Sequence, residues 1–460
     1  MTTDPVEKVT DQLEAKAAAF VKEQRLPGVA VGVVHGDRLA WSSGIGFADV
    51  ASRRGSEATT LHRIASITKT FTGTAIMQLR DEGRLHLDDP AVEHIPELRA
   101  AASPFGPIQT VTIRRLLSHE SGLVGDPPGT DWTVPIYEGH VERNLERVTE
   151  IGTRVPPNTQ QKYSNLGFQL LGEIVARVSG VAYPDYVRER ILDPLGMAST
   201  AFDPLPDDLL ERCATGYAAR YLSDELEPAS IPPIDWAEGG LWSSVEDLAR
   251  WISFQLREDA GARAGTQVLA GSTLKEMHTP RYLGNEEWSE AWCIAWYAIR
   301  RDGVTWVQHS GGIHGFVSCA CFDPKEKVGA IALVNGGVDA EDLAMGLGRI
   351  ARDAVTAAAP TIEPPATMPD AYRPLLGFYV NPEQGLVLRL EWRDAALVLL
   401  DTSDAAWRRT LAPTEEADVF LVEPGVRESG EPARFRRNAK GKVTSVHLAS
   451  ETHVRLDPVE

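Results

Sequence analysis

The spacing of apolar and polar residues changes along the chain, and each change predicts a different element. Residues 5–25 carry apolar positions at helical spacing, and Pro27 lies just beyond the predicted end of this helix. Residues 28–49 read GVAVGVVHGDRLAWSSGIGFAD, which predicts two strands around a turn at residues 35–37. The N-terminal part of the chain therefore predicts a helix followed by a β-hairpin.

The middle of the chain, roughly residues 60–280, has helical patterns separated by many loops. One helix start is clear, because Ser244 and Asp247 resemble an N-terminal cap before an apolar-periodic run. Strand patterns return at residues 292–335, and a last helix is expected around 340–357. We therefore predict an α+β fold, in which the hairpin joins the later strands in one antiparallel sheet covered by the terminal helices. A mostly helical lobe would lie beside the sheet, with a cleft between them.

A proline-rich stretch divides the C-terminal part from the rest. Residues 359–370, APTIEPPATMPD, lack periodicity and are interpreted as a linker. Residues 371–460 contain apolar runs that recur about every ten residues between polar turns, which predicts a small antiparallel β-barrel of eight strands. The predicted organisation is a first domain over residues 1–358, the linker, and the barrel.

Composition and charge exclude some classes of function. The chain has 460 residues, of which 43% are hydrophobic, and its net charge is -19. An acidic surface repels phosphate backbones, so we expect no nucleic-acid partner. The N-terminus has early acidic residues and no continuous apolar region, so it does not read as a signal peptide. No stretch approaches the ~20 apolar residues of a membrane span, and we expect no membrane association.

The cysteines indicate a reducing compartment. Four occur, and without an export signal they predict free thiols in a cytoplasmic protein. Cys319 and Cys321 alternate along a strand-like run and would share one face. A metal pair is one interpretation, but no nearby Cys or His completes a ligand set, so buried thiols are favoured and no metal is expected.

A Ser-x-x-Lys pattern at Ser66 and Lys69 is the first candidate for chemistry. Apolar residues follow Ser66 at helical spacing, so a helix is predicted to begin near it, with Lys69 one turn above on the same face. The helix N-terminus favours an oxyanion, and burial would favour a neutral lysine that takes the serine proton. The alternative is a serine at a helix start with a lysine in solvent. The same pattern recurs at Ser272 and Lys275, but Glu276 follows and predicts a solvated face.

The second candidate is Tyr163-Ser164-Asn165, which stands just before an apolar-periodic helix. A phenol near a lysine ammonium loses its proton more readily and can serve as a base. The amide of Asn165 can hold a substrate carbonyl or the lysine. The alternative is an ordinary turn before a helix, and a chance Tyr-x-Asn also occurs at residues 379–381, in the predicted barrel.

The third candidate is the run from His309 to Gly312, HSGG, after a short β-like segment. Gly311 and Gly312 would let a substrate approach the backbone of an edge strand, and the N–H of Gly312 could help to form an oxyanion hole. His309 could orient the tyrosine or meet a substrate carboxylate. By itself the motif is weak, because a histidine at a strand end is usually structural.

Other hydrolase and nucleotide motifs are absent from the sequence. There is no Gly-x-Ser-x-Gly, so a nucleophile elbow of the α/β-hydrolase kind is unsupported. Neither a phosphate-binding Gly-x-x-x-x-Gly-Lys-Ser/Thr nor a Gly-x-Gly-x-x-Gly occurs, and His-Glu-x-x-His is also missing. No cofactor is therefore expected.

Taken in order, the three motifs resemble the signature of the penicillin-recognising serine hydrolases of β-lactamase fold: Ser-x-x-Lys, Tyr-x-Asn, then Lys/His-x-Gly. The matching residues are Ser66 with Lys69, Tyr163 with Asn165, and His309 with Gly311. The phrases LLSHESGL, ILDPLGM and GGLWSSVEDLARW are also similar to the family, and the resemblance covers about residues 10–355. The family includes class C β-lactamases, D-alanyl-D-alanine carboxypeptidases, D-aminopeptidases and related esterases.

The resemblance implies a role for each matched residue. Ser66 would be the nucleophile that forms an acyl-enzyme, and Lys69 and Tyr163 would share the proton transfers. Asn165 would position the substrate, and the N–H groups of Ser66 and Gly312 would stabilise the oxyanion.

One position departs from the class C pattern, because His309 stands where those β-lactamases typically carry lysine. A histidine is only partly charged near neutrality, so a D-peptidase or esterase is favoured over a β-lactamase. We predict a serine acyl hydrolase that cleaves amide or ester bonds in a small molecule or short peptide. The alternatives are a class C-like β-lactamase and a non-catalytic ligand-binding protein on the same fold. The barrel resembles the lipocalin-like domains of some of these peptidases, where it would gate the cleft or build a homo-oligomer, and it could also bind a hydrophobic ligand.

Overall fold

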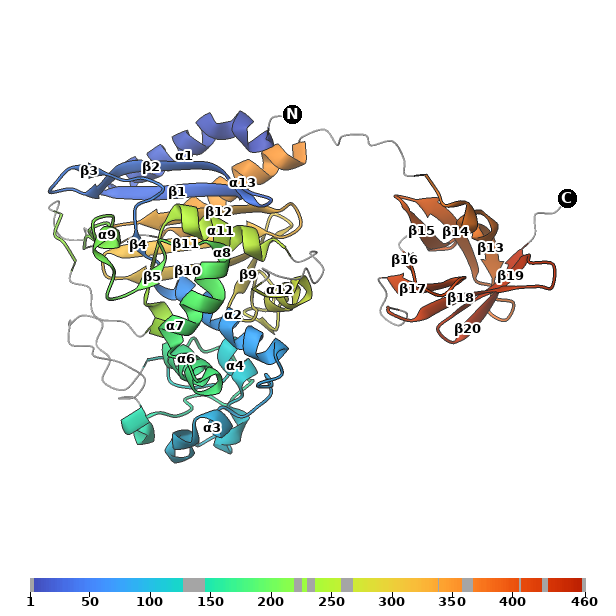
Figure 1. Cartoon of the computed structure of the whole chain (residues 1–460), viewed down its shortest axis with the longest axis horizontal. Helices are drawn as coiled ribbons and strands as arrows, with labels where there is room; N and C mark the ends of the chain where they lie inside the picture. The colour runs from blue at the N-terminus through green and yellow to red at the C-terminus, as the bar shows by residue number, and fades with distance from the viewer. Residues whose placement is uncertain are drawn as a thin grey trace. The chain divides into compact units, whose positions relative to one another are not determined.

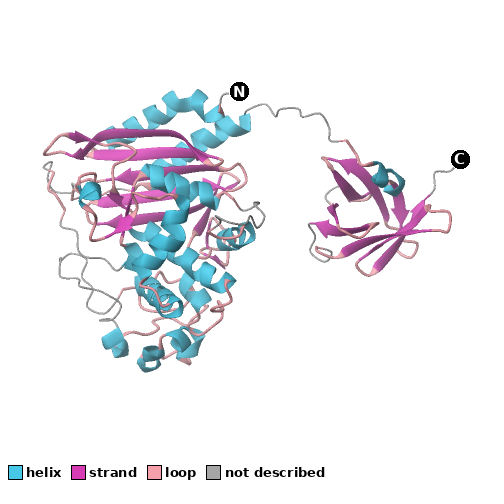
Figure 2. Ribbon diagram, in the orientation of Figure 1, coloured by secondary structure: helices cyan, strands magenta, loops and turns pink. Residues whose placement is uncertain are grey.

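The computed structural model consists of two compact units, Met1–Ala359 and Pro360–Glu460 (Figure 1). It describes residues 4–126, 145–218, 226–229, 236–257, 268–337, 339–357, 367–404, 407–423 and 429–456. Of the predicted linker, residues 359–366 lie outside the described residues. The first unit combines helices with a large sheet, whereas the second unit is almost entirely strands (Figure 2). The predicted α+β fold with a β-barrel is therefore confirmed.

A nine-stranded sheet in the order β3-β2-β1-β12-β11-β10-β9-β8-β7 forms the centre of the first unit. Its strands are β1 (Gly28–His35), β2 (Arg38–Asp49), β3 (Arg54–Gly55), β7 (Tyr282–Leu283), β8 (Glu290–Trp292), β9 (Tyr297–Arg301), β10 (Val304–Ile313), β11 (Phe316–Asp323) and β12 (Val328–Val334). The hairpin β1-β2 turns where it was predicted, and β1 pairs antiparallel with β12, so that Val29 faces Val334. The N-terminal hairpin therefore joins the later strands, as expected.

Alternate residues of β1 face two different hydrophobic layers. Val29, Val31 and Val33 pack with the terminal helices, whereas Ala30 and Val34 pack in the main core. The terminal helices are η1 (Pro5–Val9), α1 (Thr10–Glu23) and α13 (Glu341–Ala357), and they lie together along one side of the sheet in Figure 1. The predicted first helix is thus a 3₁₀ turn followed by an α-helix. On the other face, α11 (Val245–Gln255) begins after the Ser244 cap, whose hydroxyl accepts the backbone N–H of Asp247.

The mostly helical lobe lies between β4 and α10 in the sequence. Its elements are β4 (His62–Arg63), η2 (Ala65–Ile67), α2 (Thr68–Asp81), α3 (Ala91–His94), η3 (Pro96–Ala100), η4 (Ile108–Thr110), α4 (Ile113–Leu117), η5 (Val148–Glu150), α6 (Asn165–Ser179), α7 (Tyr183–Val187), the π turn η6 (Arg188–Leu192), α8 (Asp193–Leu195), β5 (Ala201–Phe202), α9 (Asp207–Leu210) and α10 (Trp236–Gly239). The short strand β6 (Leu241–Ser243) and α12 (Gly271–His278) follow. The strands β4, β6 and β5 form a small second sheet.

Helix α2 runs through the core and is buried on all sides from Thr68 to Leu79. Its threonines do not leave polar groups unpaired, because Thr70 and Thr74 donate to backbone carbonyls of the preceding turn at 2.8 and 2.9 Å. The segment at Ala295 packs closely against α2 at Gly73. A Cβ at Gly73 would collide with the Ala295 side chain, so this position requires glycine. This close packing holds the N-terminal turn of α2 in one position.

The second unit is a closed barrel in which each strand neighbours the next and β13 pairs with β20. After the 3₁₀ turn η7 (Asp370–Leu375), its strands are β13 (Gly377–Val380), β14 (Val387–Arg393), β15 (Ala396–Asp401), β16 (Arg408–Pro413), β17 (Val419–Glu423), β18 (Pro432–Arg437), β19 (Val443–Leu448) and β20 (Glu451–Leu456). All eight predicted runs form strands. Buried side chains such as Tyr379, Leu399 and Val446 fill the interior.

Cys319 and Cys321 are both buried on β11 in the layer beneath the terminal helices, and all four cysteines are free. Among the described residues, no group of three or more His, Cys, Asp or Glu side chains is placed to hold a metal ion. None of the helices in the described part of the chain is long and apolar enough to span a membrane.

His62 makes the stability of the first unit depend on pH. Its ring is 1% exposed and lies edge-on to Phe316, and this burial lowers its pKa from 6.5 to about 4. Between pH 6.5 and about pH 4 the His62 ring is therefore protonated in the unfolded chain but neutral in the folded chain. The free energy of unfolding consequently decreases as the pH falls below about 6.5. We expect the free energy of unfolding to decrease between pH 7 and pH 5, with about 2 kcal/mol of the loss due to His62.

Chemical denaturation followed by tryptophan fluorescence at the two pH values measures this effect. His62→Leu should reduce the loss by about 2 kcal/mol, whereas the same change at the exposed His86 should leave it as in the wild type. An equal loss in wild type and His62→Leu would contradict the assignment.

Candidate active site

Ser66 lies in a tight turn at the entrance to α2. The helix expected near Ser66 is present: a 3₁₀ turn spans Ala65–Ile67 and leads directly into α2, which begins at Thr68. Ala65, whose φ of 44° is left-handed, limits how far the helical run extends toward the N-terminus. Such a conformation costs an alanine about 1 kcal/mol or more and persists only where the surroundings enforce it. It leaves the Ser66 hydroxyl partly exposed at the end of a buried helix.

Lys69 is fully buried, and its Nζ donates to the Ser66 Oγ at 3.0 Å. The two side chains thus lie on one face, as the spacing predicts. A second hydrogen bond of 2.7 Å runs from Nζ to the backbone carbonyl of Glu238. Nζ also lies 5.0 Å from the ring centre of Tyr163 and 5.6 Å from that of Phe168. The solvated-lysine alternative is therefore wrong for Lys69, whose amine is held against the serine by a carbonyl and two aromatic faces.

Tyr163 and Asn165 flank the N-cap of α6. The cap is Ser164, whose Oγ accepts the N–H of Gly167 at 2.9 Å and donates to the carbonyl of Val124 at 2.7 Å. These bonds fix the backbone that brings the Tyr163 ring to Lys69. Asn165 was expected to hold a substrate carbonyl or the lysine, but its amide nitrogen donates to Asp126 at 2.7 Å. Of the described groups, it is the Glu238 carbonyl and not Asn165 that holds Lys69.

Strand β10 passes directly against the Ser66 turn. A Cβ at Gly311 would overlap the Ile64 carbonyl and lie 3.0 Å from the Ser66 backbone nitrogen, so only glycine fits there. The hydroxyl of Ser318, opposite Gly311 on β11, donates to the same Ile64 carbonyl at 2.9 Å. Gly312 is exposed, and a Cβ there would meet only a Val317 methyl at 3.7 Å. The prediction that its N–H joins that of Ser66 in an oxyanion hole stays a prediction.

His309 differs from the sequence expectation, because it is not partly charged near neutrality. The ring is 2% exposed, and burial together with the charge of Lys69 lowers its pKa to about 3. Its Nδ1 lies 2.7 Å from the Ser310 carbonyl and therefore carries the proton and donates. Its Nε2 is buried without a partner among the described groups. The rings of Tyr297 and Trp292 cover the imidazole edge-on.

His119 was not singled out from the sequence, although it stands in the phrase LLSHESGL. Its ring is fully buried and stacks on Tyr163, with ring centres 4.3 Å apart. The edge of Trp292 meets the His119 ring on another side at 4.6 Å. Neither a spacing rule nor periodicity could find this residue, because a loop carries it and the Tyr163 segment lies far along the chain. The Tyr163 ring thus lies close to both a lysine amine and an imidazole.

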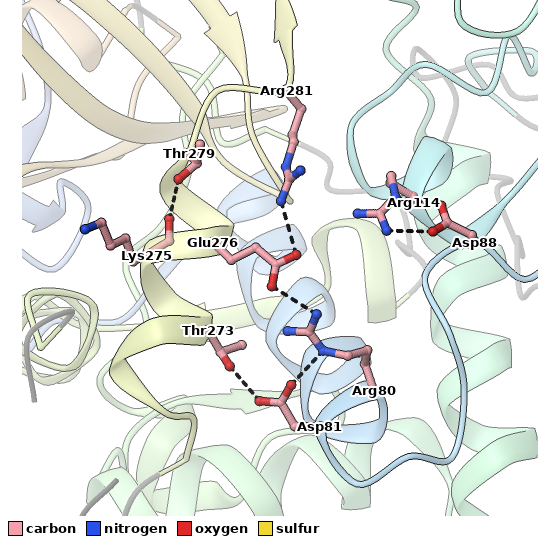
Figure 3. Close-up of polar contacts among 9 residues, drawn as sticks. All are labelled: Arg80, Asp81, Asp88, Arg114, Thr273, Lys275, Glu276, Thr279 and Arg281. Carbon is pink, nitrogen blue, oxygen red and sulfur yellow. Dashed lines mark hydrogen bonds and ion pairs between the residues drawn. The ribbon is translucent and has the colours of Figure 1, made fainter. Parts of the chain in front are cut away.

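The second Ser-x-x-Lys pattern lies on the surface, next to a glutamate that has a structural role. Ser272 and Lys275 are both exposed on α12. Figure 3 shows the Lys275 side chain pointing away from the neighbouring ion pairs. In these pairs the Glu276 carboxylate bridges Arg80, at the end of α2, and Arg281, at 2.9 and 3.1 Å. Helix α12 therefore braces α2, and the solvated face predicted for Lys275 is confirmed.

The chance Tyr-x-Asn at residues 379–381 is likewise structural. The Tyr379 hydroxyl donates to the Leu375 carbonyl inside the barrel, and the Asn381 amide donates to Glu451 at 3.2 Å. Both side chains therefore make hydrogen bonds within the second unit.

Comparisons with known proteins agree with this geometry. A profile of the family described as Beta-lactamase matches residues 13–354. Penicillin-binding protein 4 of Amycolatopsis lactamdurans is 30% identical over 333 residues, which are 70% of this chain and 84% of that protein. Protein flp of Staphylococcus aureus is 27% identical over 325 residues, 68% of this chain, and the chain spans only 61% of that relative's length.

Two solved structures show how far the likeness extends. The octameric penicillin-binding protein homologue from Pyrococcus abyssi is 25% identical, with a TM-score of 0.61 over 97% of this chain and 99% of its own. A class C β-lactamase from Rhodobacter sphaeroides, 23% identical, has the same fold, with a TM-score of 0.60 over 75% of this chain and 98% of its own.

Proposed function

The chain belongs to the β-lactamase family, and from this premise we propose that it is a serine acyl hydrolase that works through an acyl-enzyme on Ser66. The observation that carries the proposal is the 3.0 Å hydrogen bond between Ser66 and a fully buried Lys69. A lysine costs free energy to bury, and it is held here by groups that orient it toward one hydroxyl. A non-catalytic ligand-binding protein would have no need of such an arrangement.

The reaction would proceed in two steps. The Ser66 Oγ attacks the substrate carbonyl carbon while its proton passes to Lys69 or to Tyr163, which act as the base. The oxyanion is stabilised by the N–H groups of Ser66 and Gly312. Collapse of the tetrahedral intermediate breaks the bond to the leaving group, which takes a proton from the same pair. Water then attacks the acyl carbon and gives a proton to the same pair, which returns it to the Ser66 Oγ as the ester bond breaks and the acid is released.

The substrate class follows from His309 and its surroundings. A neutral, buried imidazole offers no charge to a substrate carboxylate, whereas a lysine at this position would. We infer that the preferred substrates are small esters or D-amino-acid amides and peptides, as for an esterase or D-aminopeptidase. Asn165 would position their carbonyl once its amide leaves Asp126. A class C-like β-lactamase remains the second candidate because structural neighbours carry that name.

Initial rates on one preparation with p-nitrophenyl esters, D-amino-acid amides and nitrocefin test the proposal. We expect the esters or amides to be hydrolysed with a larger kcat/KM than nitrocefin. Fastest hydrolysis of nitrocefin would reverse the order of the two candidates. If no substrate in the panel is hydrolysed and no labelled penicillin or fluorophosphonate becomes attached, the hydrolase proposal fails.

We also propose a role for the second unit and a location for the protein. We propose that the barrel is lipocalin-like and takes part in a homo-oligomer, because a homologue described as octameric matches 97% of this chain. Its filled interior supports this role better than the capture of a hydrophobic ligand. Free thiols, three of them buried, support a cytoplasmic location.

A further inference from the structure

We propose that His119 is a positioning residue that holds Tyr163 in its working geometry, by clamping the backbone on both sides of the tyrosine and stacking on its ring. The inference rests on the proposed function, since it assigns a role to a residue that acts through Tyr163. His119 lies in the loop after α4 and, among the described groups, makes no hydrogen bond to Ser66 or Lys69, and it is not itself expected to touch the substrate.

Two hydrogen bonds form the clamp. The backbone N–H of Lys162 donates to the His119 carbonyl at 2.8 Å, and the backbone N–H of Ser164 donates to the His119 Nδ1 at 3.1 Å. These amides immediately precede and follow Tyr163. A single residue thus fixes the main chain on either side of the tyrosine, which limits the directions in which its side chain can point.

The imidazole ring fixes the side chain as well. It stacks on the Tyr163 ring at 4.3 Å with an angle of 28° between the planes. Phe168 and Trp292 enclose the imidazole at 5.1 and 4.6 Å between ring centres. The histidine is fully buried in this cluster, so it cannot move without moving its neighbours. The phenol ring is therefore held against a rigid surface on the side of His119.

The protonation of His119 suits this role. Because Nδ1 accepts from Ser164, the proton of the neutral ring is on Nε2, which is buried and unpaired among the described groups. Burial first, and then the nearby Lys69, lower the pKa of His119 well below its usual range. A neutral ring keeps the Nδ1 acceptor, whereas an imidazolium would turn a second N–H toward the N–H of Ser164.

Two substitutions at His119 test the hydrogen bond and the ring stacking separately. Its φ of 59° is left-handed, which asparagine tolerates better than other non-glycine residues. His119→Asn therefore keeps the conformation and can offer an amide oxygen to Ser164, but it loses most of the stacking. His119→Phe keeps an aromatic ring against Tyr163 and leaves the buried Ser164 N–H without its acceptor.

Steady-state hydrolysis of the best ester or amide by the full chain tests the clamp. We expect His119→Phe to lower kcat by about 10- to 100-fold with KM changed less than about threefold, and His119→Asn to recover at least about tenfold of that loss. In a Tyr163→Phe background the same His119→Phe change should lower kcat almost no further, because the phenol group that His119 positions is already absent. His278 is a matched control: it is buried among Trp296 and Phe322, away from the site, and His278→Phe should leave kcat unchanged in both backgrounds.

A purely structural role would lower the activity equally in both backgrounds, and that result, or an unaltered kcat in His119→Phe, would overturn the proposal. If His119→Phe does not fold, the double-mutant comparison is made with His119→Asn. An inactive wild-type protein would contradict the proposed function alone. In that case the ¹³C NMR signal of Tyr163, identified by its loss in Tyr163→Phe, still tests the clamp: it should shift or broaden in the His119 variants and not in His278→Phe.

Discussion

Replacing Ser66 with alanine is expected to lower the rate of p-nitrophenyl ester hydrolysis by at least ~10³-fold. The side chain lost is the hydroxyl to which Lys69 donates at 3.0 Å, so no acyl-enzyme can form. The buried amine keeps its bond to the Glu238 carbonyl, and the variant should retain its fold. Any remaining rate would come from direct attack by water on a bound substrate whose oxyanion is still stabilised by the N–H donors.

Ser272→Ala is the matched control, because Ser272 has the same Ser-x-x-Lys context on the exposed face of α12. It should hydrolyse the ester at the wild-type rate. Mass spectrometry after reaction with a labelled fluorophosphonate should place the adduct on the peptide that contains Ser66. A Ser66→Ala protein with undiminished activity, or an adduct on another serine, would remove Ser66 from the mechanism.

Replacing Gly311 with alanine is expected to lower kcat/KM by at least about 10²-fold, although only a methyl group is added. The new Cβ would overlap the Ile64 carbonyl and lie 2.7 Å from the Ser318 hydroxyl and 3.0 Å from the Ser66 nitrogen. Either β10 or the nucleophile turn must move to make room. A displacement of about 1 Å at the reacting groups suffices for such a loss. Overpacking should also lower the free energy of unfolding by about 1–3 kcal/mol.

Gly55→Ala provides the comparison, since a Cβ at this exposed position of β3 meets no atom within 4 Å. Its activity and thermal midpoint should match those of the wild type. Circular dichroism distinguishes a displaced active site from a failure to fold in Gly311→Ala. If Gly311→Ala keeps the wild-type kcat/KM, the close passage of β10 against Ser66 is not required for catalysis.

The elements with the plainest periodicity could be predicted from the sequence. The hairpin of β1 and β2 has a strand pattern on each side of a short turn, and its long apolar strand can only be buried in a sheet. The barrel strands alternate between a filled interior and solvent, so each one has its own signal. For Ser66 and Lys69, spacing along a helix predicts that the two side chains share a face. The other two motifs were recognisable by their residue types and by their order in the family signature.

The remaining features depend on contacts that periodicity does not encode. The left-handed Ala65 lies in the turn before α2, where Ser318 of β11 donates to the Ile64 carbonyl and Gly311 of β10 lies close to the same group. The neutrality of His309 arises from aromatic rings of two other strands, which only the folded sheet brings over it. His119 meets Tyr163 through a loop. In each case a distant segment overrides the local preference.

The pairing of β1 with β12 has a consequence for how the chain is made. On its second edge β1 pairs with β12, where Val29 meets Val334, so the central sheet cannot form fully until nearly all of the first unit has left the ribosome. Until then β1 is paired only with β2, and its other edge is exposed to pairing with other chains. The barrel is the opposite case, since seven of its strand pairs join consecutive strands and only β13 must wait for β20. Local pairing of this kind forms faster than pairing across hundreds of residues. During synthesis, the edge of β1 is therefore open to pairing with other chains until β12 emerges and the slow long-range pairing can form.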